Sequence, residues 1–378
     1  MAGSWSRPAV PALAASAVVV LGSPFVGELR AGLLEAFPRQ YQSIMQGAVA
    51  AGGAVLVAMG LLAIRDRRPV RYVALAAAVA FAVGCEAALR TGDANVDAVE
   101  AFHFVEYAAL TWLFFRVWRH RADPSALLLP GLAALAVGTV DEWFQWFIPL
   151  RAGEARDVLM DGLSVLCGLL LSLALDPPAR FVARGRPGSW WRVGTGAALL
   201  VLLLTAFLVD VHVGHVVRDP AAGTFPSRFT AGDLRDAARD RAATWGTSPP
   251  VTVRRVSRED QYLSEGLFHV RRRNDAAEHG DLGAAWQENL ILETYFAPVL
   301  DHPSYASPRG ARWTPAQRAD VQARATPIPG FVSTANPYPI YDWPPSGPMA
   351  VGVALAVACL GAAAAAERGS RRVEDAHG

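Results

Sequence analysis

The chain has 378 residues, of which 52% are hydrophobic and only 18% are charged, and its formal net charge is +1. An ordinary soluble domain carries about 25% charged residues, so this composition indicates a membrane protein. A net charge so close to zero argues against nucleic acid and other strongly charged partners. The three cysteines all lie in apolar runs without CxxC spacing, which predicts neither a disulfide framework nor a thiolate metal site.

Apolar runs recur along the chain at the length needed to cross a bilayer. A hydrocarbon core about 30 Å thick requires about 20 apolar residues in a helix. A cleaved signal peptide is the alternative interpretation of the first run, which contains Pro8 and Pro11 and is weakly hydrophobic. The sequence predicts an all-α, polytopic protein of about eight membrane helices, at about residues 8–27, 43–64, 70–89, 98–118, 125–149, 157–176, 194–212 and 347–366.

The short loops alternate in arginine content, which predicts an orientation. Arg-rich segments occupy residues 65–71, 116–121, 179–192 and 367–372, whereas the alternate loops are poorer in Arg and richer in acid. The positive-inside rule therefore places these segments and both termini on the cytoplasmic side of the membrane. The one long hydrophilic segment, about residues 213–346, is then extracytoplasmic.

This hydrophilic segment is predicted to be mostly helical. Residues 258–279 and 282–300 each show helical spacing of apolar residues around a Gly-Asp break, and together predict a helical hairpin. The stretch 326–346 is rich in Pro and aromatic residues and has no helical period. We expect it to be an extended strap that returns the chain to the last membrane helix.

Polar residues concentrate in the fourth, fifth and sixth predicted helices and in the loop between the last two. Within each helix, residues three or four apart share a face: His103 with Glu106 and Tyr107, Asp141 with Gln145, and Asp157 with Asp161. The predicted orientation puts them in the outer half of the membrane. The residues are His103, Glu106 and Tyr107, then Asp141, Glu142 and Gln145, then Arg151 in the loop, and finally Asp157 and Asp161.

The depth of Asp141 decides how these residues are interpreted. Asp141 precedes Arg151 by about 15 Å of helix, which is near mid-depth in the hydrocarbon core. A charge there costs on the order of 3 kcal/mol, so Asp141 and Glu142 together represent roughly 6 kcal/mol if they lack partners. A buried, functional polar cluster is the favoured interpretation. A short or re-entrant helix that keeps the pair hydrated is the alternative.

Carboxylates beside one imidazole suit two kinds of chemistry. They are hard ligands for Mg²⁺, Mn²⁺ or Zn²⁺, although no motif here identifies a metal site. They also act as general acid and base without a metal. Tyr107, Gln145 and Arg151 are candidates for substrate binding, with Arg151 placed to hold a phosphate or carboxylate. The candidate catalytic residues, and the candidate ligands if a metal binds, are His103, Glu106, Asp141, Glu142, Asp157 and Asp161.

The runs HFVEY at 103–107 and DEWFQWFIPLRAGEARDVLMDGLSVLCG at 141–168 resemble the VanZ-like family of bacterial membrane proteins. The resemblance covers about residues 40–176 and implies a role in the cell envelope. The family's namesake is associated with low-level resistance to the glycopeptide teicoplanin. The matching positions are Glu106 and Tyr107, then Asp141, Glu142, Gln145, Pro149, Arg151, Asp157 and Asp161, with the small residue Ser164 in place of the pattern's glycine and Gly168 beyond.

The resemblance also suggests a division of the chain. The first helix and its loop occupy residues 1–42, the VanZ-like bundle 43–176, and an Arg-rich loop with the seventh helix 177–212. The extracytoplasmic domain follows at 213–346, and the eighth helix with the cytoplasmic tail at 347–378. Helices seven and eight and the extracytoplasmic domain lie outside the resemblance.

Three classes of function are open at this level. The first is an intramembrane enzyme that acts at the outer leaflet on an envelope lipid or lipid-linked precursor. The second is a protein that binds or shields an envelope component without turnover. The third is a proton-coupled lipid transporter, although the sequence lacks repeated helices broken by Gly or Pro. In each case the expected partners are the bilayer and lipid-linked envelope intermediates, and the sequence gives no indication of the oligomeric state.

Overall fold

The computed structural model describes residues 6–64, 66–92, 94–148, 151–178, 181–183, 185–248, 258–303, 310–336 and 338–375. The chain forms two compact units. The first, here called the bundle unit, consists of Met1–Phe144, Glu154–Phe207 and Met349–Gly378. The second, the insert unit, consists of Gln145–Gly153 and Leu208–Pro348.

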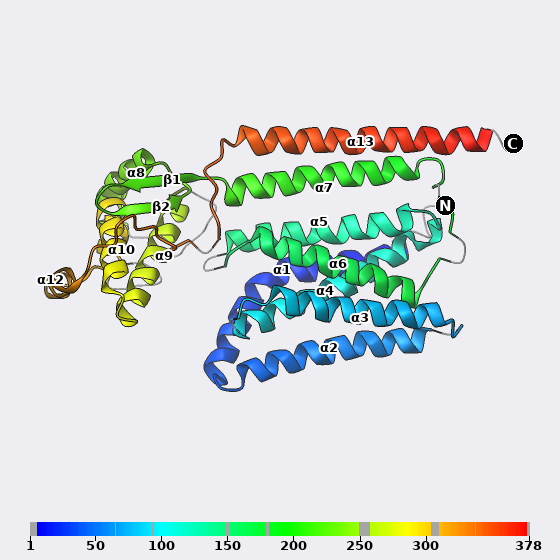
Figure 1. The fold of residues 1–378 in the computed structure, drawn as a ribbon, viewed down its shortest axis with the longest axis horizontal. Helices are drawn as coiled ribbons and strands as arrows, with labels where there is room; N and C mark the ends of the chain where they lie inside the picture. Colours follow the sequence, from blue (N-terminus) through cyan, green and yellow to red (C-terminus); the bar gives the residue numbers. More distant parts are fainter. Residues whose placement is uncertain are drawn as a thin grey trace. The chain divides into compact units, whose positions relative to one another are not determined.

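Long helices make up the bundle unit, and in Figure 1 they run side by side. Seven helices in the described ranges are long and apolar enough to cross a membrane. α4 is a further helix of 25 residues, and its contacts with α6, α2 and α1 place it inside the bundle. The all-α, polytopic membrane fold is confirmed. The helices are α1 (Ser6–Ala36), α2 (Tyr41–Ala63), α3 (Pro69–Leu89), α4 (Ala94–Trp118), α5 (Ser125–Phe147), α6 (Ala155–Leu175), α7 (Ser189–His212) and α13 (Ser346–Asp375), with a 3₁₀ turn, η2 (Arg119–Arg121), after α4.

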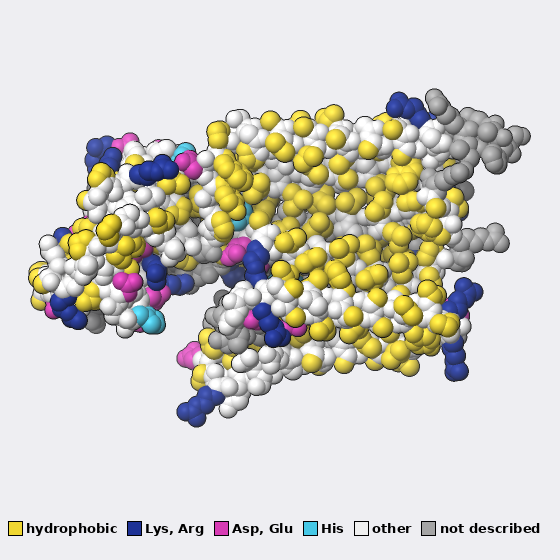
Figure 2. Space-filling view, in the orientation of Figure 1, with side chains coloured by type: hydrophobic (Ala, Val, Ile, Leu, Met, Phe, Trp, Pro, Cys, Tyr) yellow, Lys and Arg dark blue, Asp and Glu magenta, His cyan; other side chains and the backbone are white. Residues whose placement is uncertain are grey.

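The surface of the bundle unit is hydrophobic over much of the helix length. Figure 2 shows hydrophobic side chains covering its visible face, with Arg side chains gathered near the helix ends. Leu62 is 83% exposed, and Val18, Val70 and Leu199 are each more than 60% exposed. Large exposed apolar surfaces of this kind are stable in lipid but not in water. The distribution therefore agrees with helices that span a bilayer.

Close packing of α4 on α6 forms the centre of the bundle. A Cβ atom added at Gly168 of α6 would lie 2.8 Å from the Ala108 Cα atom and 2.7 Å from the Thr111 Cβ atom of α4. Only glycine permits this approach, and small residues serve the same purpose in other membrane helix pairs. Buried hydroxyl groups nearby donate to carbonyl groups of their own helix, as Thr111 does to Tyr107 at 2.6 Å.

Arg71 closes one end of the bundle at the C-terminus of α6. Its Nε atom donates to the carbonyl of Ala174 at 2.7 Å, and its Nη2 atom donates to the carbonyl of Leu175. Its Nη1 atom donates to Asp66 at 2.8 Å. The last carbonyl groups of a helix have no partner within the helix, so this buried arginine satisfies groups that would otherwise be unpaired.

The insert unit combines short helices with a small antiparallel sheet. The predicted helical hairpin is confirmed, because α9 and α10 pack on one another across a turn at Gly280, which has a φ of +80°. The sheet was not predicted, and its strands pair His215 with Ser227 and Asp219 with Gly223. The elements are β1 (His215–Asp219), β2 (Gly223–Ser227), α8 (Ala231–Thr244), α9 (Arg258–Glu278), α10 (Leu282–Tyr295), α11 (Ala297–Asp301) and α12 (Pro315–Arg324).

Aromatic side chains fill the core of the insert unit, and the strap packs along this unit. Phe225, Tyr262 and Tyr295 are completely buried. In its described part, the segment predicted to be extended, residues 326–346, has no helix before α13 and forms single bridges from Val332 to Thr224 and from Tyr341 to Val213. The strap is therefore tied to the sheet and to the end of α7.

Candidate functional site

Polar side chains from three helices meet inside the bundle unit. We call His103 and Tyr107 of α4, Asp141 and Glu142 of α5, and Asp161 of α6 the polar cluster. Tyr107, Glu142 and Asp161 are completely buried, and Asp141 is 5% exposed. Burial of so many ionisable groups among membrane helices is costly unless they bind one another, and such groups commonly mark functional sites.

A buried hydrogen bond joins His103 to Asp161. The His103 Nδ1 atom lies 2.7 Å from the Asp161 Oδ1 atom, and the histidine side chain is 16% exposed. In a neutral ring whose proton is on Nδ1, this atom donates to the carboxylate and the Nε2 atom can accept a proton. The hydrogen bond to the carboxylate thus fixes the orientation of the imidazole ring.

Gly138 of α5 makes room for the Asp161 carboxylate. A Cβ atom added at Gly138 would lie 2.4 Å from the Asp161 Oδ2 atom, far inside normal contact distance. That oxygen is buried and has no hydrogen-bond partner among the described residues. An unsatisfied buried acceptor costs about 1–3 kcal/mol, so the packing of α5 against α6 holds a carboxylate in an unfavourable place.

Asp141 is held by groups from two other helices. Ser23 of α1 donates to the Asp141 Oδ1 atom at 2.5 Å, and the Tyr107 hydroxyl lies 3.5 Å from Oδ2. The Tyr107 ring also stacks on the His103 ring, with centroids 6.0 Å apart. Tyr107 therefore lies against both Asp141 and His103. The contact of Ser23 with Asp141 makes α1 part of the site.

Glu142 lies next to the start of α6. The backbone N–H of Glu154 donates to the Glu142 Oε2 atom at 3.2 Å. The charges of Asp157, His103 and Asp161 all act on this carboxylate. At the membrane boundary, burial and the nearby negative charge of Asp157 raise the pKa of Glu154 to about 7. The turn into α6 is thus an acidic region.

Two other candidate residues, Glu106 and Asp157, act on the His103–Asp161 pair through their charges. Glu106 is exposed on α4, although its charge interacts with His103, Asp141 and Asp161. Asp157 is partly exposed and lies 3.9 Å from the Arg156 guanidinium, which pairs mainly with Glu100. The charge of Asp157 acts on His103, Glu142 and Asp161, so both residues remain candidates.

The two substrate-binding candidates of the insert unit bind one another. Arg151 donates through its Nη2 atom to the Gln145 side-chain oxygen, and both residues are at least partly buried. This contact occupies the guanidinium that we expected to hold a substrate anion. Pro149, which belongs to the family pattern, lies outside the described residues.

The metal alternative receives no support from the arrangement of side chains. In the part of the chain that the structure describes, no three His, Cys, Asp or Glu residues are grouped so that they could hold one ion.

Ser23 is the site residue that the sequence did not reveal. It lies in an apolar helix with no charged neighbours, and a lone serine in such a helix usually bonds its own backbone. Ser23 does lie 3.3 Å from the carbonyl of Val19, so only the fold reveals its contact with Asp141. Comparison of the whole chain with protein-family models, with curated proteins and with solved structures found no match.

Proposed function

We propose that this chain is a VanZ-like membrane protein of the bacterial cell envelope and an enzyme that acts on a lipid or lipid-linked precursor. The observation that carries the proposal is the buried His103–Asp161 hydrogen bond of 2.7 Å. An imidazole oriented in this way removes a proton from a hydroxyl group or water and later returns it to a leaving group. A substrate embedded in the bilayer suits a site that lies among membrane helices.

In this proposal the residues of the polar cluster have different roles. His103 is the general base, and Asp161 orients it and stabilises its charged form. Asp141 and Glu142 provide the negative surroundings that favour a protonated imidazole during reaction. Tyr107, held against His103 by stacking, positions the ring.

The proposal includes an orientation and a cellular role. The Arg-rich segments at 65–71, 116–121 and 367–372 support cytoplasmic termini by the positive-inside rule, so that the polar cluster is nearer the outer leaflet of the plasma membrane. An enzyme there is placed to modify envelope precursors. The resemblance to the VanZ-like family adds low-level resistance to teicoplanin-type glycopeptides as the expected phenotype.

A second candidate function, binding without turnover, is favoured by the way Asp141 is enclosed. Its carboxylate is 5% exposed and accepts a hydrogen bond from Ser23. A carboxylate satisfied in this way contributes to a rigid binding frame more readily than to proton transfer. The two functions differ in whether a converted product forms.

Deletion of the gene in its own host tests the proposal. Membrane lipids and wall precursors are compared by mass spectrometry after complementation with wild type, His103→Gln or the control His120→Gln, which changes an exposed histidine on the turn after α4. We expect one precursor to accumulate in the deletion and to be cleared by wild type and His120→Gln only. Full clearance by His103→Gln, at equal protein level, would contradict an enzymatic role for the pair.

A further inference from the structure

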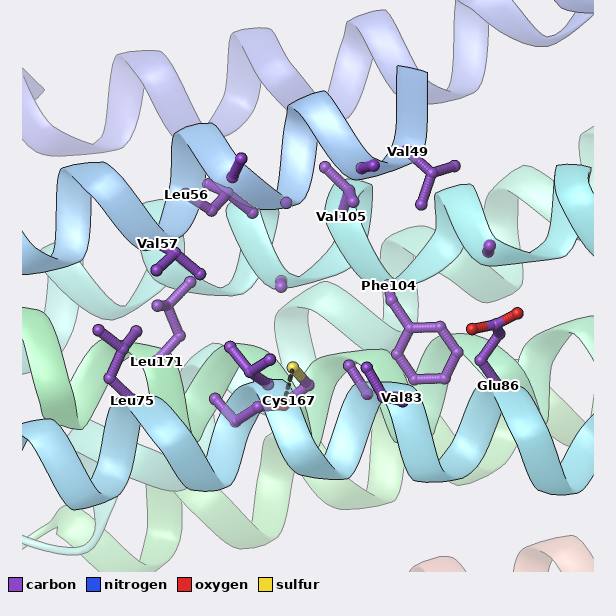
Figure 3. A pocket seen from close by; sticks show the side chains of 18 residues that line it. Val49, Leu56, Val57, Leu75, Val83, Glu86, Phe104, Val105, Cys167 and Leu171 are labelled. Carbon is purple, nitrogen blue, oxygen red and sulfur yellow. Dashed lines mark hydrogen bonds between the residues drawn. The ribbon is translucent and has the colours of Figure 1, made fainter. Parts of the chain in front are cut away.

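A cleft opens between α2 and α3, and none of the residues of the polar cluster lines it. It has a volume of about 300 Å³, within the range of small-molecule sites. α2 and α3 make few contacts with one another, because α2 packs mainly on α4 and α3 mainly on α6. Figure 3 shows side chains of α2 and α3 facing each other across the cleft, labelled Val49, Leu56 and Val57 on one side and Leu75, Val83 and Glu86 on the other.

Small side chains create the space in this cleft. Its walls include Ala50, Gly53 and Ala54 of α2 and Ala78 and Ala82 of α3. The floor is formed by α4 and α6, with residues such as Phe104 and Leu171. Apart from Glu86, the lining consists of apolar residues, so the interior fits a hydrocarbon chain.

One end of the cleft is polar. A second cavity, of about 540 Å³, continues from it and shares Val49, Ala50, Val83, Glu86 and Ala101 with it. This second cavity is lined in addition by two amides and two charged groups of both signs. These residues are Gln42, Gln46, Arg90 and Asp97.

The charged groups at the polar end are accessible. Arg90 and Glu86 form an ion pair at 3.0 Å, and their side chains are 59% and 32% exposed. The Asp97 carboxylate accepts hydrogen bonds from the backbone and the hydroxyl group of Thr91. An exposed ion pair is worth little by itself, so exchanging it for a ligand of complementary charge costs little.

The cleft matches one leaflet of a bilayer in length. Its lining on α3 extends from Leu75 to Glu86, which is about 16 Å of helix. Half of a hydrocarbon core is about 15 Å thick. The polar end lies where α3 ends and α4 begins, which is the level of lipid headgroups for a spanning helix.

We propose that this cleft binds a membrane phospholipid with an aminoalkyl phosphate headgroup, with one acyl chain between α2 and α3. The phosphate lies at Arg90, and the ammonium group lies between Glu86 and Asp97. The acyl chain fills the apolar cleft down to Leu75. This site is distinct from the polar cluster and does not depend on the proposed function.

Native mass spectrometry of the purified protein tests the acyl-chain site. Ala82→Phe fills the cleft, and the matched control Ala80→Phe adds the same ring on the exposed face of α3. We expect wild type and Ala80→Phe to retain one phospholipid and Ala82→Phe to retain at least tenfold less. Equal retention by Ala82→Phe and Ala80→Phe would overturn the proposal.

A covalent test does not depend on how the filling variant folds. A benzophenone amino acid is introduced at Val83 in the cleft or at Ala80 as control, and the membranes are irradiated. We expect a lipid adduct at position 83 that exceeds the adduct at position 80 at least fivefold. Equal adducts would show ordinary contact with bulk lipid and would contradict a specific site.

Nanodiscs of defined composition test the headgroup. In equimolar phosphatidylethanolamine and phosphatidylglycerol, we expect the retained lipid to be enriched at least tenfold in phosphatidylethanolamine, and Arg90→Gln together with Glu86→Gln to abolish the enrichment. Retention of both lipids in the ratio supplied, or enrichment in phosphatidylglycerol, would refute an aminoalkyl headgroup site.

Discussion

Replacing Gly138 with alanine should displace the Asp161 carboxylate and break its hydrogen bond to His103. The added Cβ atom would lie 2.4 Å from the Asp161 Oδ2 atom, whereas ordinary contacts begin at 3.4 Å. The carboxylate or the α5 backbone must therefore move by about 1 Å. Asp161 has a short side chain that is buried and already bonded at 2.7 Å, so this movement cannot be absorbed without cost.

The expected loss follows from two opposing effects. Losing a charged hydrogen bond costs about 1.5–3 kcal/mol. Alanine in place of glycine within a helix recovers about 1 kcal/mol. Gly138→Ala should thus lower the free energy of unfolding by about 0.5–2 kcal/mol. If the pair acts in catalysis, a displacement of about 1 Å should also reduce turnover roughly 100-fold.

Gly131, two turns earlier on α5, provides the matched control. A Cβ atom there would meet Leu169 and Val165 at 3.5 Å, which is an ordinary contact. Gly131→Ala should therefore leave the protein as stable as wild type or slightly more stable. Detergent-induced unfolding in mixed micelles, followed by circular dichroism, measures both variants. Equal unfolding free energies for Gly138→Ala and Gly131→Ala would refute the steric reasoning.

Three further changes test the bundle around the site. In a double-mutant cycle of His103→Gln and Asp161→Asn, the coupling energy from unfolding should be about 1.5–3 kcal/mol, and additive effects would mean that the pair contributes no interaction. Gly168→Ala should destabilise the bundle by about 1–3 kcal/mol because α4 and α6 must separate, whereas Gly162→Ala, with its nearest contact at 3.9 Å, should be tolerated in the same unfolding assay. The folded protein holds a proton on Glu154 more tightly than the unfolded chain does. The stability that protonated Glu154 contributes should therefore be fully present below pH 4.5 and should be lost as the pH rises to about 7. If the free energy of unfolding of Glu154→Gln changed with pH in this window just as that of wild type does, the assignment would be contradicted.

The membrane helices could be predicted from sequence because the bilayer fixes their length. Apolar runs near 20 residues have few alternatives to a spanning helix, and the ends of α2, α3 and α6 fall within two residues of those expected. The strands β1 and β2 were missed because each has only five residues. The buried residues are Val217 in β1 and Phe225 and Ser227 in β2. Short strands of this kind leave almost no periodic signal.

The positions of His103, Glu106 and Tyr107 show where sequence spacing becomes insufficient. Successive residues of a helix are about 100° apart around its axis, so Glu106 and Tyr107 flank the direction of His103 on opposite sides. Tyr107 consequently points toward Asp141, whereas Glu106 is exposed. Spacing identifies a common face, but which side of that face meets a neighbouring helix depends on packing.

The close approach of Gly138 to Asp161 was likewise not predictable, because it depends on how α5 is rotated against α6. A glycine in a membrane helix has many roles, and its partner is visible only when the helices are placed. The same holds for Ser23, whose partner lies 118 residues away in the sequence.

The central claim is that the His103–Asp161 pair performs chemistry on a lipid. The most direct measurement reconstitutes purified wild type or His103→Gln into vesicles made from lipids of the deletion host and follows every lipid species by mass spectrometry over time. The account predicts that wild type converts one species into a new product and that His103→Gln, present in equal amount and with the same helix content, forms at least 100-fold less. Equal product with both proteins, or binding of a lipid by wild type without any product, would contradict it.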